Sequence, residues 1–502
     1  MSLLGIDVGT SGCKALVFSE EGQLLAAAYE EYDYKHPQPG WAELDTLEVW
    51  ESIQRTIRKA ARGAAQDPVR ALCVSSLGES FVPVTANRQI LGPSLLNFDG
   101  RGAEYLPELR ARLSDEQIYR INGNPLGNHY GLTKLLWLKQ HQPELYQKAD
   151  WLLHWSGFVS FMLGADPAID YSLANRTLLF DLEKRDWSDE LLELAEFERI
   201  KLPPTVPTGT LIGQVNRRLA QELGLPPAIP IISGAHDQCC NGVGCGVTEP
   251  GRAMYGMGTY ICMMPVFDHR PAAEVMLAQG LNTEHHAVPG QFVSFIYNQG
   301  GVLVKWFRDT FAAAERKQFA ATGEDIYAVL TAEMPSGVSR VMVLPHFTVT
   351  GPPKFIDGSC GLIAGLRLET TRGEILKGLI EATTFYLREC FESLPPGIDI
   401  SDFRAAGGGS KSDAWLQICA DILGRPFLRP SVIEAGALGA AIIAGTGGRI
   451  FPSIEAGVET MVKWERQFSP DPAMQERYSE RFEKYHRLWP LVQDYLLDLA
   501  VS

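Results

Sequence analysis

Short apolar runs separated by glycine-containing turns open the chain. Three such runs come first, LLGIDV, CKALVFS and LLAAAYEEY, with the turns GTSG and EEGQ between them. This pattern predicts a meander of antiparallel strands. The period then changes, because Val49, Ile53, Ile57 and Ala60 recur at helical spacing. We therefore expect a helix over 47–65, followed by a strand in RALCVSSLG.

The second half of the chain has a similar pattern. It contains GRAMYGMGTYICMMPVF (251–267), which predicts a strand, a Gly-Thr turn and another strand. A triple glycine at 407–409 leads into a predicted helix with Ser412 as its N-cap and Gly424 after its end. The small residues of 434–445 predict a helix suited to close packing.

The middle of the chain predicts helices over 104–163 and a proline-rich loop around a short strand at 202–215. A chain of 502 residues exceeds what one hydrophobic core usually supports. Because the strand, turn and strand pattern occurs in both halves, we predict two domains, residues 1–247 and 248–502.

Charge and composition exclude some classes of partner. The formal net charge is -15, so no nucleic-acid partner is expected, since such proteins displace counterions with lysine and arginine. The start lacks the basic and apolar regions of a signal peptide, and no stretch reaches 18 apolar residues. We therefore expect a cytoplasmic protein with no membrane partner. The nine cysteines include no C-x-x-C pair, which predicts reduced thiols and no zinc site.

The first turn carries groups that suit a polyphosphate. In GIDVGTSGCK, Asp7 ends an apolar strand, Gly9 lets a ligand approach the backbone, and Lys14 supplies a cation. Thr10 and Ser11 add hydroxyl groups and amides. A carboxylate at this place can hold the magnesium ion of a nucleotide, directly or through water. The alternative is an ordinary hairpin with typical turn residues.

Two further turns have comparable chemistry. Gly258 and Thr259 in YGMGTY would place a second phosphate-binding hairpin across a cleft from the first. Gly408 and Gly409 open a predicted helix, and helix N-terminal amides without side chains suit a ribose or a phosphate. Taken alone, each of these motifs is also typical of a plain turn.

Taken in order, the motifs resemble the FGGY family of carbohydrate kinases, which belongs to the actin, sugar kinase and Hsp70 superfamily. The resemblance covers nearly the whole chain. It implies an α/β fold of two ribonuclease-H-like domains, of the actin ATPase type, around a central cleft, with ATP and Mg²⁺ as cofactors. The motifs are IDVGTSGCK (6–14), NHYGLTKLLWL (128–138), SGAHDQ (233–238), GMGT (256–259), GGGSKSDAWLQICADILGRP (407–426) and EAGALGAAIIAG (434–445).

The resemblance also implies roles for individual residues. The family's catalytic base is an Asp at the end of a strand, and SGAHDQ matches that motif with Asp237. Asp237 would accept the proton of an acceptor hydroxyl during phosphoryl transfer, and Asp7 would hold Mg²⁺ through water. A structural turn residue is the alternative for Asp237. The other implied ATP contacts are Gly9, Thr10, Ser11 and Lys14 for the transferred phosphate, Gly258 and Thr259 for the ATP phosphates, and Gly408, Gly409 and Ser412 for the nucleoside.

The substrate-contacting motifs are mixed. Glu79 and Gln238 follow the pattern of glycerol kinases, whose Glu contacts a substrate hydroxyl. Asp99 and Arg101 stand where many pentulose kinases have Trp-x-Asp-x-Arg, with Asn97 in place of the aromatic residue. A solvated surface loop is the alternative for this Asp-x-Arg pair. The resemblance implies a small sugar or polyol as acceptor, favouring a ketopentose such as xylulose or ribulose over an erythritol- or glycerol-type polyol.

Two other classes of protein use the same motifs. The first is a nucleotide-gated interaction protein like Hsp70 or actin, but the Asp237–Gln238 pair fits a substrate pocket better. The second is a catalytically silent sensor of sugar and nucleotide, against which the retention of Asp7, Lys14 and Asp237 argues. A homodimer is expected only because oligomers are common in the family.

Overall fold

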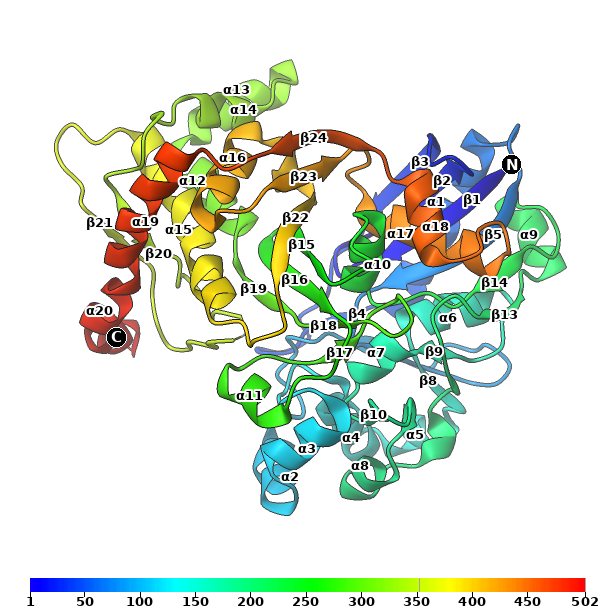
Figure 1. Cartoon of the computed structure of the whole chain (residues 1–502). Helices are drawn as coiled ribbons and strands as arrows, with labels where there is room; N and C mark the ends of the chain where they lie inside the picture. Colours follow the sequence, from blue (N-terminus) through cyan, green and yellow to red (C-terminus); the bar gives the residue numbers. More distant parts are fainter. Residues whose placement is uncertain (352, 502) are drawn as a thin grey trace.

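Two sheets organise the chain, one built from each half (Figure 1). The computed structural model describes residues 1–351 and 353–501. In this part of the chain the first sheet has six strands and the second has eight. In spatial order the first sheet contains β13 (Leu211–Gln214), β14 (Pro230–Ile232), β5 (Val69–Ser76), β1 (Ser2–Val8), β2 (Gly12–Ser19) and β3 (Leu24–Glu31).

The predicted meander is confirmed. Strands β1, β2 and β3 pair in antiparallel order, and β5 lies parallel to β1 after the helix α1 (Thr46–Gly63). The Asp45 side chain caps α1 by accepting hydrogen bonds from the amides of Leu47 and Glu48. Val49, Ile53 and Ile57 of α1 are buried, as their spacing predicts.

Alternate residues of β1 face two different cores, because successive side chains of a strand point to opposite faces. Leu4 and Ile6 join the core under α1, whereas Leu3 joins the core under α17 (Ala435–Gly447). Gly5 allows α17 to approach this second face, since a Cβ at Gly5 would lie 1.9 Å from the carbonyl oxygen of Ala437. The same alternation places Asp7 on the α17 face.

The second sheet begins with a hairpin like the first. In spatial order it contains β17 (Glu284–His285), β18 (Phe292–Val293), β16 (Tyr260–Phe267), β15 (Gly251–Met257), β22 (Ile400–Ala406), β23 (Phe427–Pro430) and β24 (Trp464–Phe468), with β19 (Ile296–Gln299) paired to β16. The predicted pairing of β15 with β16 is confirmed. The helices of this half include α11 (Ala273–Ala278), α12 (Gly301–Phe311), α13 (Ala313–Thr322), α14 (Ile326–Ala332), α15 (Arg372–Glu392), α16 (Asp413–Leu423), α19 (Pro472–His486) and α20 (Leu488–Val501).

The space between the two sheets is filled by α10 (Asp237–Gly244) and α17 (Figure 1). Small residues let these helices touch, since a Cβ at Gly439 would lie 1.9 Å from the carbonyl oxygen of Cys240. The helices α17 and α18 (Ile454–Met461) therefore pack with the first sheet although they lie late in the sequence. The domain boundary at residues 247 and 248 stays a prediction.

The region expected to be helical over 104–163 also contains a strand. The strand β8 (Trp151–His154) pairs with β6 (Phe81–Val84), so the expectation of helix alone was wrong there. The helices before and after it are α2 (Leu106–Arg112), α3 (Asp115–Asn122), α4 (Gly131–His141), α5 (Pro143–Lys148), α6 (Trp155–Leu163), α7 (Tyr171–Asn175), α8 (Asp189–Leu194) and α9 (Arg217–Leu223).

Strand β17 of the second half docks onto the helical region of the first half. The Thr283 amide donates to the carbonyl oxygen of Gly123 at 2.8 Å, and the His285 amide donates to Oδ1 of Asn175 at 3.1 Å. Within the described residues, the helices are all too short or too polar to cross a bilayer.

Candidate functional site

Asp7 lies at the C-terminal end of β1, on the face that α17 covers. Its Oδ1 accepts a hydrogen bond from the Ser75 hydroxyl on β5 at 2.8 Å. Its Oδ2 faces the first turn of α17, where a Cβ at Gly436 would lie 3.3 Å away. Burial raises the pKa of Asp7, the Ser75 hydrogen bond and Lys14 oppose the rise, and Glu434 adds to it. The carboxylate is thus fixed in place with one oxygen left for a ligand.

The turn between β1 and β2 is tight. The Gly9 amide donates to the carbonyl oxygen of Gly12 at 2.9 Å, and the Tyr32 hydroxyl donates to the carbonyl oxygen of Gly9 at 2.6 Å. Thr10 and Ser11 form the tip, and Ser11 is exposed. The turn therefore presents backbone and hydroxyl groups at the edge of the sheet, next to Asp7.

Lys14 lies opposite Asp7 in the register of β1 and β2. Its ammonium group forms an ion pair with Glu434, the residue before α17. Both side chains of the pair are partly exposed, so the contact is weak enough for a phosphate to replace it. Lys14 is a cation held beside the turn by an exchangeable partner.

The second turn, Gly258 and Thr259, joins β15 to β16. The amides of Gly300 and Gly301, at the start of α12, donate to the carbonyl oxygens of Thr259 and Gly258 at 3.2 and 3.0 Å. This glycine pair was missed from the sequence. Its signal was a Gly-Gly step between an apolar strand and an amphipathic helix, which places helix amides beside the turn.

The glycine-rich turn before α16 lies beside the second hairpin. A Cβ at Gly409 would lie 3.0 Å from Cβ of Met257, whereas a Cβ at Gly408 would meet no atom within 4 Å. Ser412 caps α16 as predicted, since its hydroxyl accepts a hydrogen bond from the Trp415 amide at 3.3 Å. The structure thus brings together Gly258, Gly408 and Gly409, with open space next to Gly408.

Asp237 begins the helix α10, five residues after Ile232, the last residue of β14. We expected Asp237 at the end of a strand, but it lies in the first turn of the helix that follows the strand. Its Oδ1 accepts a hydrogen bond from the Gln238 amide group at 3.2 Å and lies 3.2 Å from Nε2 of His236. Asn241 follows one turn later, and a Cβ at Gly436 would lie 3.3 Å from both its Oδ1 and Oδ2 of Asp7. Helix α10 and Asp7 therefore meet across Gly436.

Electrostatics tie Asp237 to both hairpins. The pKa of Asp237 is raised to about 7, first by burial and then by the carboxylates of Asp7 and Glu79. Burial also raises the pKa of Cys262 on β16 to about 12, and the charge of Asp237 adds to that rise. Asp237 thus sits between the two sheets with the pKa of a group that can accept a proton near neutral pH.

Glu79 is buried and has a left-handed backbone, with φ of 62°. Such a conformation is costly for a residue with a side chain and often occurs at functional sites. Its Oε1 accepts hydrogen bonds from Nε and Nη2 of Arg176, with 2.6 Å for the Nε contact. Arg176 was missed from the sequence, where one arginine in SLANRTLL gives no signal.

Asp99 and Arg101 form a buried pair, so the interpretation as a solvated loop was wrong. Nη2 of Arg101 lies 2.7 Å from Oδ2 of Asp99 and 2.8 Å from Oε2 of Glu43. The guanidinium group also lies 4.1 Å from the ring of Trp41 and 4.9 Å from that of Trp137. The guanidinium group of Arg101 and the carboxylate of Asp99 bond mainly to each other. This arrangement is typical of residues that support a binding pocket without contacting the ligand.

Lys134 connects this pair to Glu79. Burial lowers the pKa of Lys134 to about 8, whereas the carboxylates of Asp99 and Glu79 oppose the fall. The predicted substrate residues from two separate motifs therefore lie around one lysine.

The residues present fit a magnesium ion bound with a nucleotide. Asp7 offers a carboxylate oxygen, the hard donor that Mg²⁺ prefers, because only its Oδ1 accepts the hydrogen bond from the Ser75 hydroxyl. Among the described residues no cluster of three or more His, Cys, Asp or Glu side chains could hold a metal by itself. Mg²⁺ that accompanies a nucleotide usually keeps several waters and is held by one or two carboxylates together with substrate phosphates.

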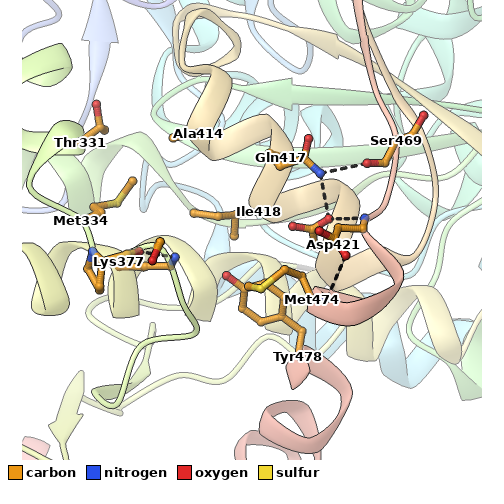
Figure 2. A pocket seen from close by; sticks show the side chains of 13 residues that line it. Thr331, Met334, Lys377, Ala414, Gln417, Ile418, Asp421, Ser469, Met474 and Tyr478 are labelled. Carbon is orange, nitrogen blue, oxygen red and sulfur yellow. Dashed lines mark hydrogen bonds between the residues drawn. The ribbon is translucent and has the colours of Figure 1, made fainter. Parts of the chain in front are cut away.

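A cavity of about 510 Å³ lies elsewhere, between α14, α15, α16 and α19 (Figure 2). Its polar side chains bond to each other and to the backbone. Gln417 donates to Oδ1 of Asp421 at 2.8 Å and to the carbonyl oxygen of Ser469 at 2.9 Å, and Lys377 donates to the carbonyl oxygen of Pro335 at 2.7 Å. The predicted site residues do not line it, so we do not assign the reaction to it.

Comparisons with known proteins identify the family of the chain. The chain matches the N-terminal domain of the FGGY family of carbohydrate kinases over residues 2–244 and the C-terminal domain over residues 253–447. It is 29% identical to an autoinducer-2 kinase of Klebsiella pneumoniae, over 97% of this chain and 93% of that protein. It is 30% identical to an autoinducer-2 kinase of Escherichia coli K12, over 97% and 94%.

Solved structures show the same fold. A xylulose kinase from Rhodospirillum rubrum has a TM-score of 0.85 at 24% identity, covering 99% of this chain and all (100%) of that one. The Plasmodium falciparum glycerol kinase with ADP has a TM-score of 0.83 at 19% identity, covering 97% of each chain. These likenesses confirm the expected α/β fold with two actin-type domains. From the family matches, the chain belongs to the FGGY family of carbohydrate kinases, and the protein is an ATP-dependent carbohydrate kinase.

Proposed function

We propose that the protein transfers the γ-phosphoryl group of Mg²⁺-ATP to a hydroxyl of a small, uncharged, polyhydroxylated acceptor, with Asp237 as general base. The candidates are a ketopentose such as xylulose or ribulose, an erythritol- or glycerol-type polyol, and autoinducer-2, which the names of the relatives add. The single observation that carries the proposal is the position and raised pKa of Asp237 between the two hairpins.

The residues divide the work as follows. Asp237 accepts the hydroxyl proton while the acceptor oxygen bonds to the γ-phosphorus and the bond to ADP breaks. Gly9, Thr10, Ser11 and Lys14 hold the transferred phosphate. Asp7 would hold Mg²⁺, which would supply positive charge to the phosphates when bound. The remaining ATP contacts are Gly258 and Thr259 for the phosphates, and Gly408, Gly409 and Ser412 for the nucleoside.

The acceptor is proposed to lie beside Asp237, Gln238 and Glu79. Asp99 and Arg101 support this pocket from behind, through Lys134 and the two tryptophan rings. The support for this arrangement is the shared electrostatic influence of Asp99 and Glu79 on Lys134.

The test is a coupled ATP-consumption screen over ketopentoses, ketohexoses, deoxyketoses, tetritols, pentitols, glycerol and autoinducer-2. One acceptor should exceed the others by orders of magnitude in kcat/KM, and Asp237→Asn should abolish that excess. If no acceptor raises ATP consumption above the rate without acceptor, a silent sensor becomes the better proposal.

A further inference from the structure

Phe355 places an aromatic ring of the second half against the first half of the chain. Its ring lies 6.0 Å from the imidazole of His129, with an angle of 31° between the two planes. His129 lies shortly before α4, in the helical region of the first half. Phe355 keeps 40% of its surface exposed. The two rings therefore meet across the halves at a place that solvent reaches.

The backbone of Phe355 is held in a costly conformation. Its φ of 45° lies in the left-handed region, which a bulky side chain rarely adopts. Two hydrogen bonds fix the segment that carries the ring, from the Thr350 amide to the carbonyl oxygen of Ile356 at 3.1 Å and from the Ile356 amide to the Thr350 hydroxyl at 2.8 Å. Strain of this kind is frequent where a chain clamps a ligand. Because the ring stays partly exposed, its packing offsets only part of the cost.

The segment that carries Phe355 rests on Tyr297 of β19. Gly351 allows this contact, since a Cβ there would lie 2.3 Å from Cδ2 of Tyr297. Tyr297 lies opposite Cys262 in the register of β19 and β16. Burial raises the pKa of Cys262, and the charge of Asp237 adds to the rise. In the second half, Phe355 is therefore linked to the surroundings of the proposed base through Tyr297 and Cys262.

A second path leads from His129 to Asp237 through the first half. The rings of His129 and Tyr130 lie 4.0 Å apart, and the guanidinium group of Arg176 lies 4.9 Å from the Tyr130 ring. Arg176 donates hydrogen bonds to Glu79. The carboxylate of Glu79 adds to the rise that burial causes in the pKa of Asp237. The ring pair and the proposed base are therefore linked through both halves of the chain.

Side chains along these two paths are open to a ligand. Asp237 has 27% of its side chain exposed, and His129, Tyr297 and Phe355 are also partly exposed. Small-molecule sites commonly combine apolar and aromatic walls with a few polar groups that fix orientation. The negative face of an aromatic ring attracts the slightly positive hydrogens of C–H groups. Such rings suit the carbon–hydrogen face of a sugar or polyol, whose hydroxyl groups bind to polar side chains.

We propose that Phe355 is an acceptor-binding residue whose ring covers the carbon–hydrogen face of the acceptor from the second half, while His129 borders the acceptor from the first half. The inference rests on the proposed function and adds a residue to the acceptor site of that function. The left-handed backbone of Phe355 then serves to hold the ring against the first half.

Phe355→Gly tests the proposal, because glycine adopts the left-handed backbone readily and removes only the ring. We expect the KM of the best acceptor in the coupled screen, xylulose and ribulose included, to rise at least tenfold while the ATP KM stays unchanged. The melting temperature should stay close to that of the wild type, because relieved strain and lost packing oppose each other. A merely structural residue would give the reverse pattern, a lower melting temperature with an unchanged acceptor KM.

Two further variants are controls. Phe355→Tyr keeps the aromatic ring and should keep the acceptor KM within threefold of the wild type. Ala228 also has a left-handed backbone, with φ of 57°, and lies exposed before β14. Ala228→Gly makes the same kind of backbone change at that site and should leave the acceptor KM unchanged.

Phe355→Asn is the alternative if the glycine variant does not fold, since asparagine also adopts the left-handed backbone and lacks the ring. A folded Phe355→Gly or Phe355→Asn enzyme that keeps the wild-type acceptor KM overturns the inference and leaves the proposed function intact. Failure of both variants to fold would assign Phe355 a structural role and overturn the inference as well. If the wild type consumes ATP with none of the acceptors, the proposed function fails and the inference fails with it.

Discussion

Asp237 and Asp7 interact across the space between the two sheets. Burial raises the pKa of Asp237 to about 7, and the carboxylate of Asp7 is the largest electrostatic contribution to that rise. The charge of Asp7, the residue proposed to hold the metal, thus raises the pKa of Asp237, the residue proposed to accept the proton. The two functions are coupled by charge although their elements, α10 and β1, come from distant parts of the sequence.

This coupling predicts the pH dependence of activity. A general base works only as the carboxylate, so kcat/KM for the acceptor should rise with pH and level off above a midpoint near 7. Glu79→Gln should move the midpoint to lower pH, because it removes one charge that raises the pKa of Asp237. A pH profile from 5 to 9 at saturating Mg²⁺-ATP measures both. A wild-type profile that is flat across this range would contradict the assignment.

Asp237→Asn should lower kcat by roughly a hundredfold or more, the scale that general-base catalysis supplies. The ATP KM should stay close to that of the wild type, because Asp237 does not contact the nucleotide in the proposed arrangement. Steady-state kinetics with the best acceptor measure both values. Near-normal turnover would remove Asp237 from the role of base.

The same substitution should stabilise the unliganded protein at high pH. The carboxyl group titrates near 3.8 when unfolded and near 7 when folded, so between these values the folded state holds a proton that the unfolded state has lost. Stability therefore falls as pH rises through this window. Asn removes that cost, about 1.4 kcal/mol per pH unit at most. Since 27% of the side chain is exposed, we expect a gain of about 1 to 3 kcal/mol at pH 8.

Thermal melts at pH 8 and pH 5 test this prediction. Asp237→Asn should melt above the wild type at pH 8, and the gap should shrink at pH 5, where the wild-type carboxyl group is protonated. An equal gap at both pH values would show that packing, and not charge, causes it.

The sequence predicted individual helices and strands better than it predicted which of them pack together. The β1 to β3 meander and the caps of α16 follow from periodicity, Gly424 and Ser412, which act over a few residues. Prediction from the sequence fails at Gly436. This residue faces Asp7 only because α17 crosses to the first sheet. That crossing depends on packing of small residues from distant segments, which no local pattern records.

The sequence also predicted only part of the candidate site, namely the residues that lie in recognisable motifs. Asp7, Lys14 and Asp237 lie in motifs with their own spacing, whereas Arg176 and Glu284 lie in segments without one. Their contact is made by the docking of β17 onto the helical region, 108 residues along the chain. Asp99 and Arg101 were found by position, but their burial between Trp41 and Trp137 was not, since the rings come from two other segments.

Asp7→Asn should change the dependence on magnesium. The substitution keeps the shape of the side chain, including an oxygen for the Ser75 hydroxyl, and removes the charge that attracts the cation. We expect activity to fall and the Mg²⁺ concentration for half-maximal activity to rise several-fold at fixed ATP. Magnesium titrations at two ATP concentrations measure the change. Superimposable titration curves at equal activity would remove Asp7 from the metal site.

The glycine-rich turn allows a nucleotide contact to be separated from a folding role. A Cβ at Gly408 would meet no protein atom within 4 Å, and one at Gly258 would meet only the Tyr260 carbonyl oxygen at 3.6 Å. Alanine should therefore fit at both positions without loss of melting temperature. If ATP approaches these backbones, the added methyl group should raise the ATP KM at least tenfold and leave the acceptor KM unchanged.

Gly409→Ala is the contrasting variant in the same turn. Its Cβ would lie 3.0 Å from Cβ of Met257 and 3.1 Å from the carbonyl oxygen of that residue, so crowding should lower its melting temperature, whatever its effect on ATP. Gly408→Ala separates the two causes because it adds the same methyl group one residue earlier, into open space. A Gly408→Ala enzyme with unchanged melting temperature and unchanged ATP KM would show that this turn shapes the fold and does not contact the nucleotide.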